Sequence, residues 1–333
     1  MGNLSEKDLA LVAIGKFLND EGYEFTAITP ASHAIVNARE TAGSARTLRD
    51  IFGWSRSFDA DELPDNLLAW LSEAGELENV ADRFRSKIRF STLKSSLYIH
   101  SAFPTSDADA VFFGPDTYRF ADLIERTVGS KTSNSRNTSD TSNTSHSSTS
   151  GSSVKRILDI GCGSGAGGLF LAGKLPSQKL QVFLSDINAR ALRYARVNAA
   201  LSGNENVSVL MGDTTHAITG PLDIIISNPP YLVDSEARLY RNGGGAAGCD
   251  LSVRIVRESI SLLAPGGMLI VYTGTPVVEG RHVFRDAIAP ILVAAQIRFV
   301  YTEIDPDVFG EELAHPAYAY TERLAAVSLV VHR

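Results

Sequence analysis

The chain is poor in cysteine, with only Cys162 and Cys249 among its 333 residues. Two thiols cannot build the disulfide framework of a small secreted domain, so we expect a protein of the reducing cytoplasm. Neither cysteine stands at metal-ligand spacing from any of the seven histidines, and we therefore expect no metal site.

Long apolar runs and excess positive charge are also missing. No uninterrupted apolar stretch approaches the length of a membrane span, and the polar, acidic start of the chain does not resemble a signal peptide. The net charge is −7, which argues against a protein that binds long duplex DNA. What remains is an ordinary globular composition, long enough for two domains.

Residues 129–153 lack aliphatic and aromatic side chains, and sixteen of these 25 residues are Ser or Thr. Such a segment cannot bury a core, so we expect a flexible insertion. Since the segments on both sides of it fit one predicted domain, we expect it on the surface, where a long loop has a small entropic cost.

The most informative motif is Asn228-Pro229-Pro230-Tyr231, which follows the apolar run 222–226. The run predicts a buried strand. Both prolines lack a backbone N–H, so their carbonyl oxygens have no donor beside them. The result is a flat slot rich in acceptors, suited to a planar group with an N–H2, such as a carboxamide or the exocyclic amine of a base. Tyr231 can stack on such a group.

A glycine-rich turn lies upstream. A short apolar strand around Asp159 leads into Gly161, Gly163 and Gly165, which precede a predicted helix. Glycines there allow a tight turn and a close approach of the backbone to a ligand. With Gly168, the pattern G-x-G-x-x-G is also met, so a dinucleotide site is the alternative.

Two further predicted strands end in acidic residues. Residues 180–184 lead to Asp186, and residues 207–211 lead to Asp213. The carboxyl ends of parallel strands meet at one edge of a sheet, where open α/β sheets bind ligands. An acidic residue at the end of the second strand can hold the hydroxyls of a ribose.

These four motifs, in their order along the chain from the glycine turn to Asn-Pro-Pro-Tyr, resemble the class I S-adenosylmethionine-dependent methyltransferases over about residues 111–333. The resemblance implies an α/β fold with a Rossmann-like seven-stranded methyltransferase sheet and an antiparallel final strand. In that family Asn-Pro-Pro-Tyr marks enzymes that methylate nitrogen. The implied cofactor is S-adenosyl-L-methionine. The resemblance implies that its methionine part faces Gly161, Gly163 and Gly165, and that its amino group lies above Asp159. Asp186 would hold its ribose, and Asp213 with Thr214 would meet its adenine. Asn228 is also implied to bind the cofactor.

Residues 111–128 also resemble the segment that closes over the cofactor in HemK-type glutamine methyltransferases. We therefore predict a cofactor lid that contains Phe113, Pro115 and Thr117. The alternative is a helix that is capped near Asp116 and packs on the sheet through Phe120 and its neighbours at helical spacing.

We expect residues 1–105 to form a smaller, mainly helical, winged-helix-like domain that recognises the substrate, and residues 106–333 to form the methyltransferase domain. Helices are predicted from Ser5 onward, over 30–41, 47–52 and 64–72, with a stop at Gly75. Residues 87–102 are strand-like with a turn near Lys94.

Basic and aromatic residues alternate between positions 83 and 98 of this domain. They form either an RNA-contacting face or a solvated strand face with the aromatic rings packed beneath, and the second is the preferred interpretation. The residues are Arg83, Phe84, Arg85, Lys87, Arg89, Phe90, Lys94 and Tyr98.

Two later segments lie near the predicted slot. The glycines at 243–245 and 248 suggest a mobile loop after Tyr231. The connection 305–321 is long for a hairpin, and its aromatic residues either wall a substrate pocket or cover an edge strand. These residues are Phe309, His315, Tyr318 and Tyr320.

Transfer of a methyl group to an amide or aromatic amine requires a positioned nitrogen with a localised lone pair. The side-chain oxygen of Asn228 and the carbonyl of Pro229 can accept hydrogen bonds from that nitrogen. The sequence leaves three functions open: methylation of a protein glutamine of the release-factor type, methylation of a ribosomal RNA or other nucleic-acid base at adenine N6 or guanine N2, and binding of S-adenosylmethionine without catalysis.

Overall fold

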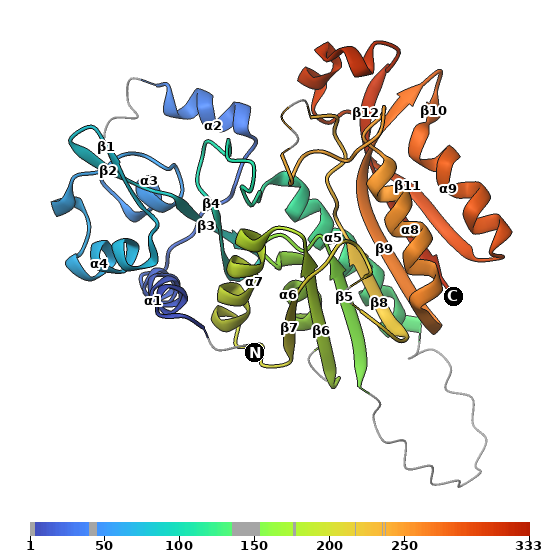
Figure 1. Ribbon diagram of the computed structural model, residues 1–333, viewed down its shortest axis with the longest axis horizontal. Coiled ribbons are helices and arrows are strands. Elements are labelled where there is room, and N and C mark those ends of the chain that lie inside the picture. Colours follow the sequence, from blue (N-terminus) through green and yellow to red (C-terminus); the bar gives the residue numbers. More distant parts are fainter. Residues whose placement is uncertain are drawn as a thin grey trace, which may run out of the picture.

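The computed structural model describes residues 4–39, 45–134, 154–175, 178–216, 218–234, 236 and 238–333. A smaller amino-terminal unit, residues 4–101, lies beside a larger α/β unit (Figure 1). Helix α5 (Pro115–Asn134) continues into the Ser/Thr-rich segment that we expected to be flexible from residue 129, and the rest of that segment lies outside the described residues.

The large unit is built on one twisted sheet with the strand order β11-β12-β9-β8-β5-β6-β7. Strands β5 to β9 pair with one another in parallel, whereas β12 is antiparallel to both β9 and β11. This confirms the predicted seven-stranded sheet with an antiparallel final strand. The strands are β5 (Lys155–Ile160), β6 (Leu180–Asp186), β7 (Val207–Met211), β8 (Leu222–Ser227), β9 (Leu263–Val278, extended by β10, Arg281–His282), β11 (Arg298–Asp305) and β12 (Arg323–His332).

Helices cover both faces of the sheet. α5, α6 (Ala166–Gly173) and α7 (Ala189–Leu201) pack on one face, and α8 (Asp250–Leu262) and α9 (Val283–Ala294) pack on the other. Each face has its own apolar core. The helices therefore leave the carboxyl ends of the parallel strands free to build a site. Among the described residues, no helix is long and apolar enough to cross a membrane.

The amino-terminal unit contains the predicted helices α1 (Glu6–Asp20), α2 (Pro30–Asn37), α3 (Leu48–Phe52) and α4 (Asp65–Ala74). Ser5 caps α1, and Gly75 ends α4 with a left-handed φ of 75°. The strand-like stretch forms the hairpin β3 (Ile88–Leu93) and β4 (Ser96–Ser101). A second hairpin, β1 (Leu77–Val80) and β2 (Arg83–Ser86), was not predicted.

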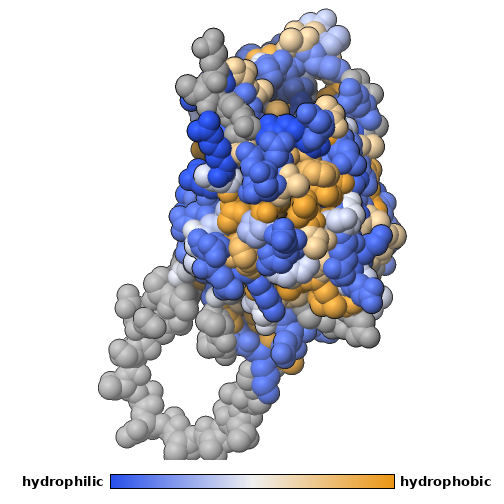
Figure 2. All heavy atoms as spheres, turned by 90° about the vertical axis from the view of Figure 1, so that its left-hand side faces the viewer, coloured by the Kyte–Doolittle hydropathy of each residue, from blue (hydrophilic) through white to orange (hydrophobic). Residues whose placement is uncertain are grey.

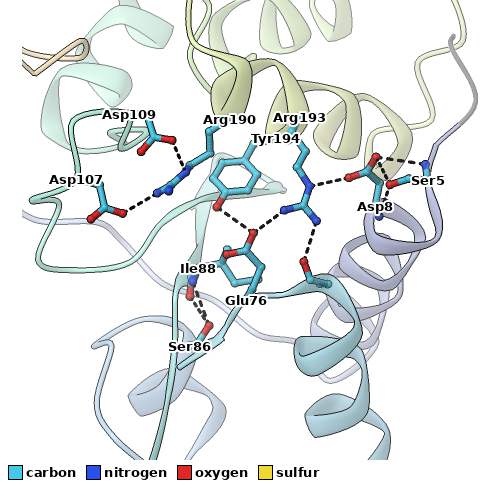
Figure 3. A network of polar contacts seen from close by, with 11 residues as sticks. Ser5, Asp8, Glu76, Ser86, Ile88, Asp107, Asp109, Arg190, Arg193 and Tyr194 are labelled. Carbon is cyan, nitrogen blue, oxygen red and sulfur yellow. Dashed lines mark hydrogen bonds and ion pairs between the residues drawn. The ribbon is translucent and has the colours of Figure 1, made fainter. Parts of the chain in front are cut away.

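Helix α7 joins the two units (Figure 3). Arg193 on this helix donates hydrogen bonds to Asp8 at 2.8 Å, to Glu76 at 2.7 Å and to the carbonyl of Ala74. One turn earlier, Arg190 pairs with Asp107 and Asp109 of the segment that leads into α5 (Figure 3). The amino-terminal unit is thus fixed to the helix that begins directly after β6.

Three of the basic residues named above pair with carboxylates within the protein. Arg83 pairs with Asp59 and Glu62, Arg85 with Glu78, and Lys94 with Asp122 and Glu125, while Phe90 and Tyr98 are buried. Figure 2, which looks onto this unit, shows polar residues around a central group of apolar ones. These ion pairs argue against an RNA-contacting face, and the buried aromatic rings fit the preferred interpretation. The solvated strand face is wrong for β3, because that strand is largely buried and Arg89 on it is 4% exposed and contacts His33.

Candidate active site

A pocket lies at the carboxyl ends of β5, β6, β7 and β8, as the strand-end pattern predicted. It is completed by residues of the segment 110–117, by the loop after Asn228 and by Phe309. Of the predicted site residues, Gly165, Phe113 and Pro115 are absent from its lining. Those that line it are Asp159, Gly161, Gly163, Asp186, Asp213, Thr214, Asn228, Pro229, Tyr231 and Thr117.

The glycines after β5 have two different roles. Gly161 and Gly163 are left-handed, with φ of 64° and 54°. A Cβ at Gly161 would meet no atom within 4 Å, so the backbone here borders open space in the pocket. A Cβ at Gly165 would lie 3.0 Å from Leu184 and 3.3 Å from Ala195, so this glycine allows α6 to pack closely on β6 and α7.

Two carboxylates lie beneath the glycine turn. Asp186 accepts the N–H of Gly163 and the N–H of Asn188, both at 2.9 Å, yet burial raises its pKa. Asp159 is fully buried and accepts the N–H of Gly168 at 2.7 Å. Burial, with a contribution from nearby Asp186, raises the pKa of Asp159 to about 7.

The loop after β7 is held by α8. Arg254 donates to the carboxylate of Asp213 at 2.8 Å, and the hydroxyl of buried Thr214 donates to Glu258. Thr214 has a left-handed φ of 52°. A non-glycine residue in this conformation persists only where its surroundings fix it, and such residues cluster at functional sites. The predicted contact of Asp213 with an adenine remains a prediction.

Asn228 follows β8 and is half-buried in the pocket wall. Within the described part of the chain, its side-chain amide has no hydrogen-bond partner, which leaves its oxygen able to accept from a ligand. Tyr231 is more enclosed than predicted, with an exposed fraction of 7%. Its ring lies against Gly274 of β9, where an added Cβ would come within 2.2 Å of the ring.

Asp116 fixes this tyrosine. Its carboxylate accepts hydrogen bonds from the hydroxyls of Tyr231, at 2.5 Å, and Tyr272, at 2.8 Å, and it pairs with Arg119 at 3.1 Å. Burial and the neighbouring carboxylate raise the pKa of Tyr231 well above its usual value. The sequence suggested only a helix cap at Asp116, because no local pattern connects it to tyrosines so far along the chain.

The predicted lid needs a correction at Phe113. This residue is buried between the two units, where its ring stacks on His100 at 5.0 Å. Its neighbour Phe112 lines the pocket instead and stacks on Tyr240 at 5.7 Å. Successive side chains of an extended segment point to opposite sides, so a shift of one residue exchanges a core ring for a pocket ring. Pro115 begins α5.

Two of the glycines after Tyr231 lie against other backbone segments. Gly243 exchanges hydrogen bonds with its surroundings, donating to Leu232 at 2.8 Å and accepting from Leu251 at 2.9 Å. A Cβ at Gly248 would lie 2.4 Å from the carbonyl oxygen of Tyr231. Gly243 and Gly248 therefore permit two backbone segments to touch behind the slot. The mobility of this loop remains a prediction.

Residues 144–278 match the model of the family described as methyltransferase small domain. This segment is similar to that family. Its carboxyl end coincides with the end of β9. The matched segment contains the glycine turn, Asp186, Asp213 and Asn228, while the amino-terminal unit, α5 and Phe309 lie outside the match.

Several curated relatives are similar to part of the chain. The release factor glutamine methyltransferase of Deinococcus radiodurans is 35% identical over 172 residues, which cover 47% of this chain and 55% of the relative. The tRNA1(Val) (adenine(37)-N6)-methyltransferase of Aeromonas hydrophila subsp. hydrophila is 34% identical over 135 residues, covering 38% of this chain and 55% of the relative. The chain thus spans about half the length of these relatives.

Among solved structures, the crystal structure of Trm5b from Pyrococcus abyssi covers 81% of this chain and 71% of its own. It is 15% identical, with a TM-score of 0.46. The structure of TYW2 from M. jannaschii in complex with AdoMet is 11% identical, with a TM-score of 0.45, and covers 74% of this chain and 85% of its own.

Proposed function

We propose that this protein transfers a methyl group from S-adenosylmethionine to a planar amide or amine nitrogen, with a protein glutamine as the acceptor. The observation that carries the proposal is the position of Asn228, Pro229 and Tyr231 on the wall of the pocket whose floor contains Gly161 and Asp186. The release factor glutamine methyltransferases among its relatives support the same reaction class.

The residues present fit this cofactor. The open space beside Gly161 and Gly163 is a cradle that any larger residue would fill. Asp186 supplies a carboxylate on the pocket lining for a ribose diol, and Asp159 lies buried beneath the turn. When bound, S-adenosylmethionine supplies an electrophilic methyl group on a sulfonium.

The chain's own residues position the acceptor nitrogen. The side-chain oxygen of Asn228 and the carbonyl oxygen of Pro229 accept hydrogen bonds from its N–H groups, which helps to localise the lone pair on the nitrogen. Holding the nitrogen in line with the methyl group supplies most of the rate enhancement, because the displacement depends on a close and oriented approach. The new nitrogen–carbon bond forms as the carbon–sulfur bond breaks, and the nitrogen then releases its extra proton to water, so the displacement itself requires no general base.

The charge distribution favours a protein over a nucleic acid as the acceptor. Phosphate binding depends on available Lys and Arg side chains. In the amino-terminal unit Arg83, Arg85 and Lys94 already pair with carboxylates, and the net charge is −7. The tRNA and ribosomal RNA methyltransferases among the relatives keep a base amine as the second candidate. We infer a cytoplasmic substrate of the release-factor type, recognised through the amino-terminal unit.

The test is to incubate the protein with methyl-labelled S-adenosylmethionine and, separately, with release factors and unmodified ribosomal RNA. Label on a glutamine of the release factor is the expected result. Label only on the RNA would reassign the acceptor to a base. Tight cofactor binding with label on neither would leave a cofactor-binding protein without this activity and would overturn the proposal.

A further inference from the structure

Phe309 is an aromatic side chain of the pocket that none of the sequence motifs contains. It lies in the connection between β11 and β12, outside the family match, and reaches the pocket beside Tyr231. The two ring centroids are 6.0 Å apart with an interplanar angle of 64°. The side chain is half-buried, so part of its ring surface remains open.

The backbone of Phe309 is held in a costly conformation. Its φ and ψ are 55° and 43°, the left-handed region that bulky residues avoid. The preceding residue, Val308, is buried and donates its N–H to Leu324 of β12 at 2.7 Å. The following turn, η3 (Gly310–Ala314), closes with the N–H of Glu312 on the carbonyl of Phe309 at 2.9 Å. Residues held in such strained backbone conformations cluster at functional sites, which supports a functional role for Phe309 at the pocket.

The connection is also tied to the loop that follows Tyr231. Glu312 pairs with Arg241 of that loop, and the hydroxyl of buried Tyr318 accepts the N–H of Val233 at 2.9 Å. The segment therefore packs against the slot, and Phe309 does not merely cover an edge strand. Tyr320 of the same connection is 88% exposed and contributes nothing to the pocket.

Tyr231 itself offers little free surface for stacking. Gly274 lies against its ring, and Asp116 binds its hydroxyl. A planar acceptor whose N–H groups bind Asn228 and Pro229 would gain from an apolar ring beside it. Phe309 is a partly open ring of the pocket that lies directly against Tyr231. Resting on the proposed function, we propose that Phe309 binds the planar acceptor group and sets the specificity of the slot for flat amides or amines.

The experiment compares methyl transfer by the full-length wild type and variants, using whichever of the release factor and ribosomal RNA the wild type methylates. Phe309→Ala is expected to raise KM for the acceptor and to lower kcat/KM about ten-fold, the scale of one aromatic contact. Phe309→Tyr keeps a ring and is expected to retain the wild-type rate. The dissociation constant for S-adenosylmethionine is expected to be unchanged in both.

A glycine variant separates function from folding. Phe309→Gly removes the ring but suits the left-handed backbone, so its melting temperature is expected to equal or exceed that of Phe309→Ala while its kcat/KM stays low. Tyr320→Ala is the matched control and should behave as the wild type. Wild-type kcat/KM in both Phe309→Ala and Phe309→Gly overturns the inference and leaves the proposed function standing. A wild-type protein that methylates neither acceptor overturns the proposed function, and this inference with it.

Discussion

The carboxylate of Asp116 lies 2.5 Å from the hydroxyl of Tyr231, although 115 residues separate them in the chain. The same carboxylate binds Tyr272 of β9, and Arg119 extends the contact to Asp305 at the end of β11. Asp116 thus connects α5 to three segments around the acceptor slot. Its position at the start of α5 makes that helix part of the site.

Replacement of Asp116 by Ala is expected to lower the free energy of unfolding by about 1–3 kcal/mol for each tyrosine hydroxyl left buried without an acceptor. The loss is measured by urea denaturation. Tyr272→Phe is the matched control, because it removes one of the two bonds and leaves Tyr231 held. It should cost about 1 kcal/mol and keep methyl transfer. Equal stability of Asp116→Ala and wild type would contradict this role of the carboxylate.

The positions of the strand ends were predictable, because each strand is marked by a local run of apolar residues. A parallel sheet then brings these ends together at one edge. The apolar runs before Asp159, Asp186 and Asn228 define parallel strands, whose carboxyl ends meet at one edge. The contacts of Asp116 were not predictable, because they depend on how α5 packs against β9. For Phe309 the sequence left two alternatives, a pocket wall or the cover of an edge strand, because the choice depends on how the connection 305–321 packs against the loop after Tyr231.

The missed hairpin at 77–86 has a local cause. Its strands are short and rich in charged residues, so no alternation of apolar residues marks a buried face. The close packing of Gly243 and Gly248 was not predictable either, since a sequence does not reveal which backbone lies against a glycine. In the structure that backbone is the one at Tyr231.

Asn228→Ala is expected to keep the dissociation constant for S-adenosylmethionine and to lower kcat for methyl transfer by about 100-fold or more, the loss seen when one positioned polar contact to a transition state is removed. Calorimetric titration with the cofactor and single-turnover transfer assays measure the two quantities. Equal loss of cofactor affinity and transfer would mean that Asn228 serves the cofactor rather than the acceptor.

Gly274→Ala tests the support behind Tyr231. The new Cβ would lie 2.2 Å from the tyrosine ring, so the ring or β9 must shift, at a cost of about 1–3 kcal/mol. We expect lower stability and slower transfer, with the cofactor dissociation constant unchanged. Gly173→Ala is the control, since a Cβ there meets no atom within 4 Å. A Gly274→Ala protein as active and stable as the control would show that the ring moves freely.

The raised pKa of Asp159 predicts a pH dependence of stability. Its ordinary value is 3.8, and burial raises it to about 7 in the folded protein. Between these two values the folded state holds a proton that the unfolded state has released, so the free energy of unfolding falls as pH rises through this window. Asp159→Asn cannot ionise and still accepts the N–H of Gly168. We expect urea titrations from pH 4 to pH 7 to show that the variant gains stability relative to wild type as pH rises. A constant difference between the two proteins would exclude a protonated Asp159.

Arg193 makes ion pairs between the two units. We expect these pairs to contribute more to the free energy of unfolding than an exposed ion pair does. Arg193→Ala leaves the carboxylate of Glu76, which is buried and has a raised pKa, without its cation. Loss of one partner of a buried pair costs about 3–5 kcal/mol. The measurement is thermal and urea unfolding. Arg281→Ala is the control, because its pair with Asp286 is exposed and should contribute less than about 1 kcal/mol.

The double variant Arg193→Ala with Glu76→Gln identifies the cause of that loss. If the cost arises from an uncompensated buried charge, the neutral glutamine should restore a large part of the stability that Arg193→Ala removes. If the cost arises from lost packing of the arginine side chain between α1 and α7, the second substitution should restore nothing. The first outcome is expected, because Glu76 is far more enclosed than the arginine and also lies 3.5 Å from the hydroxyl of buried Tyr194.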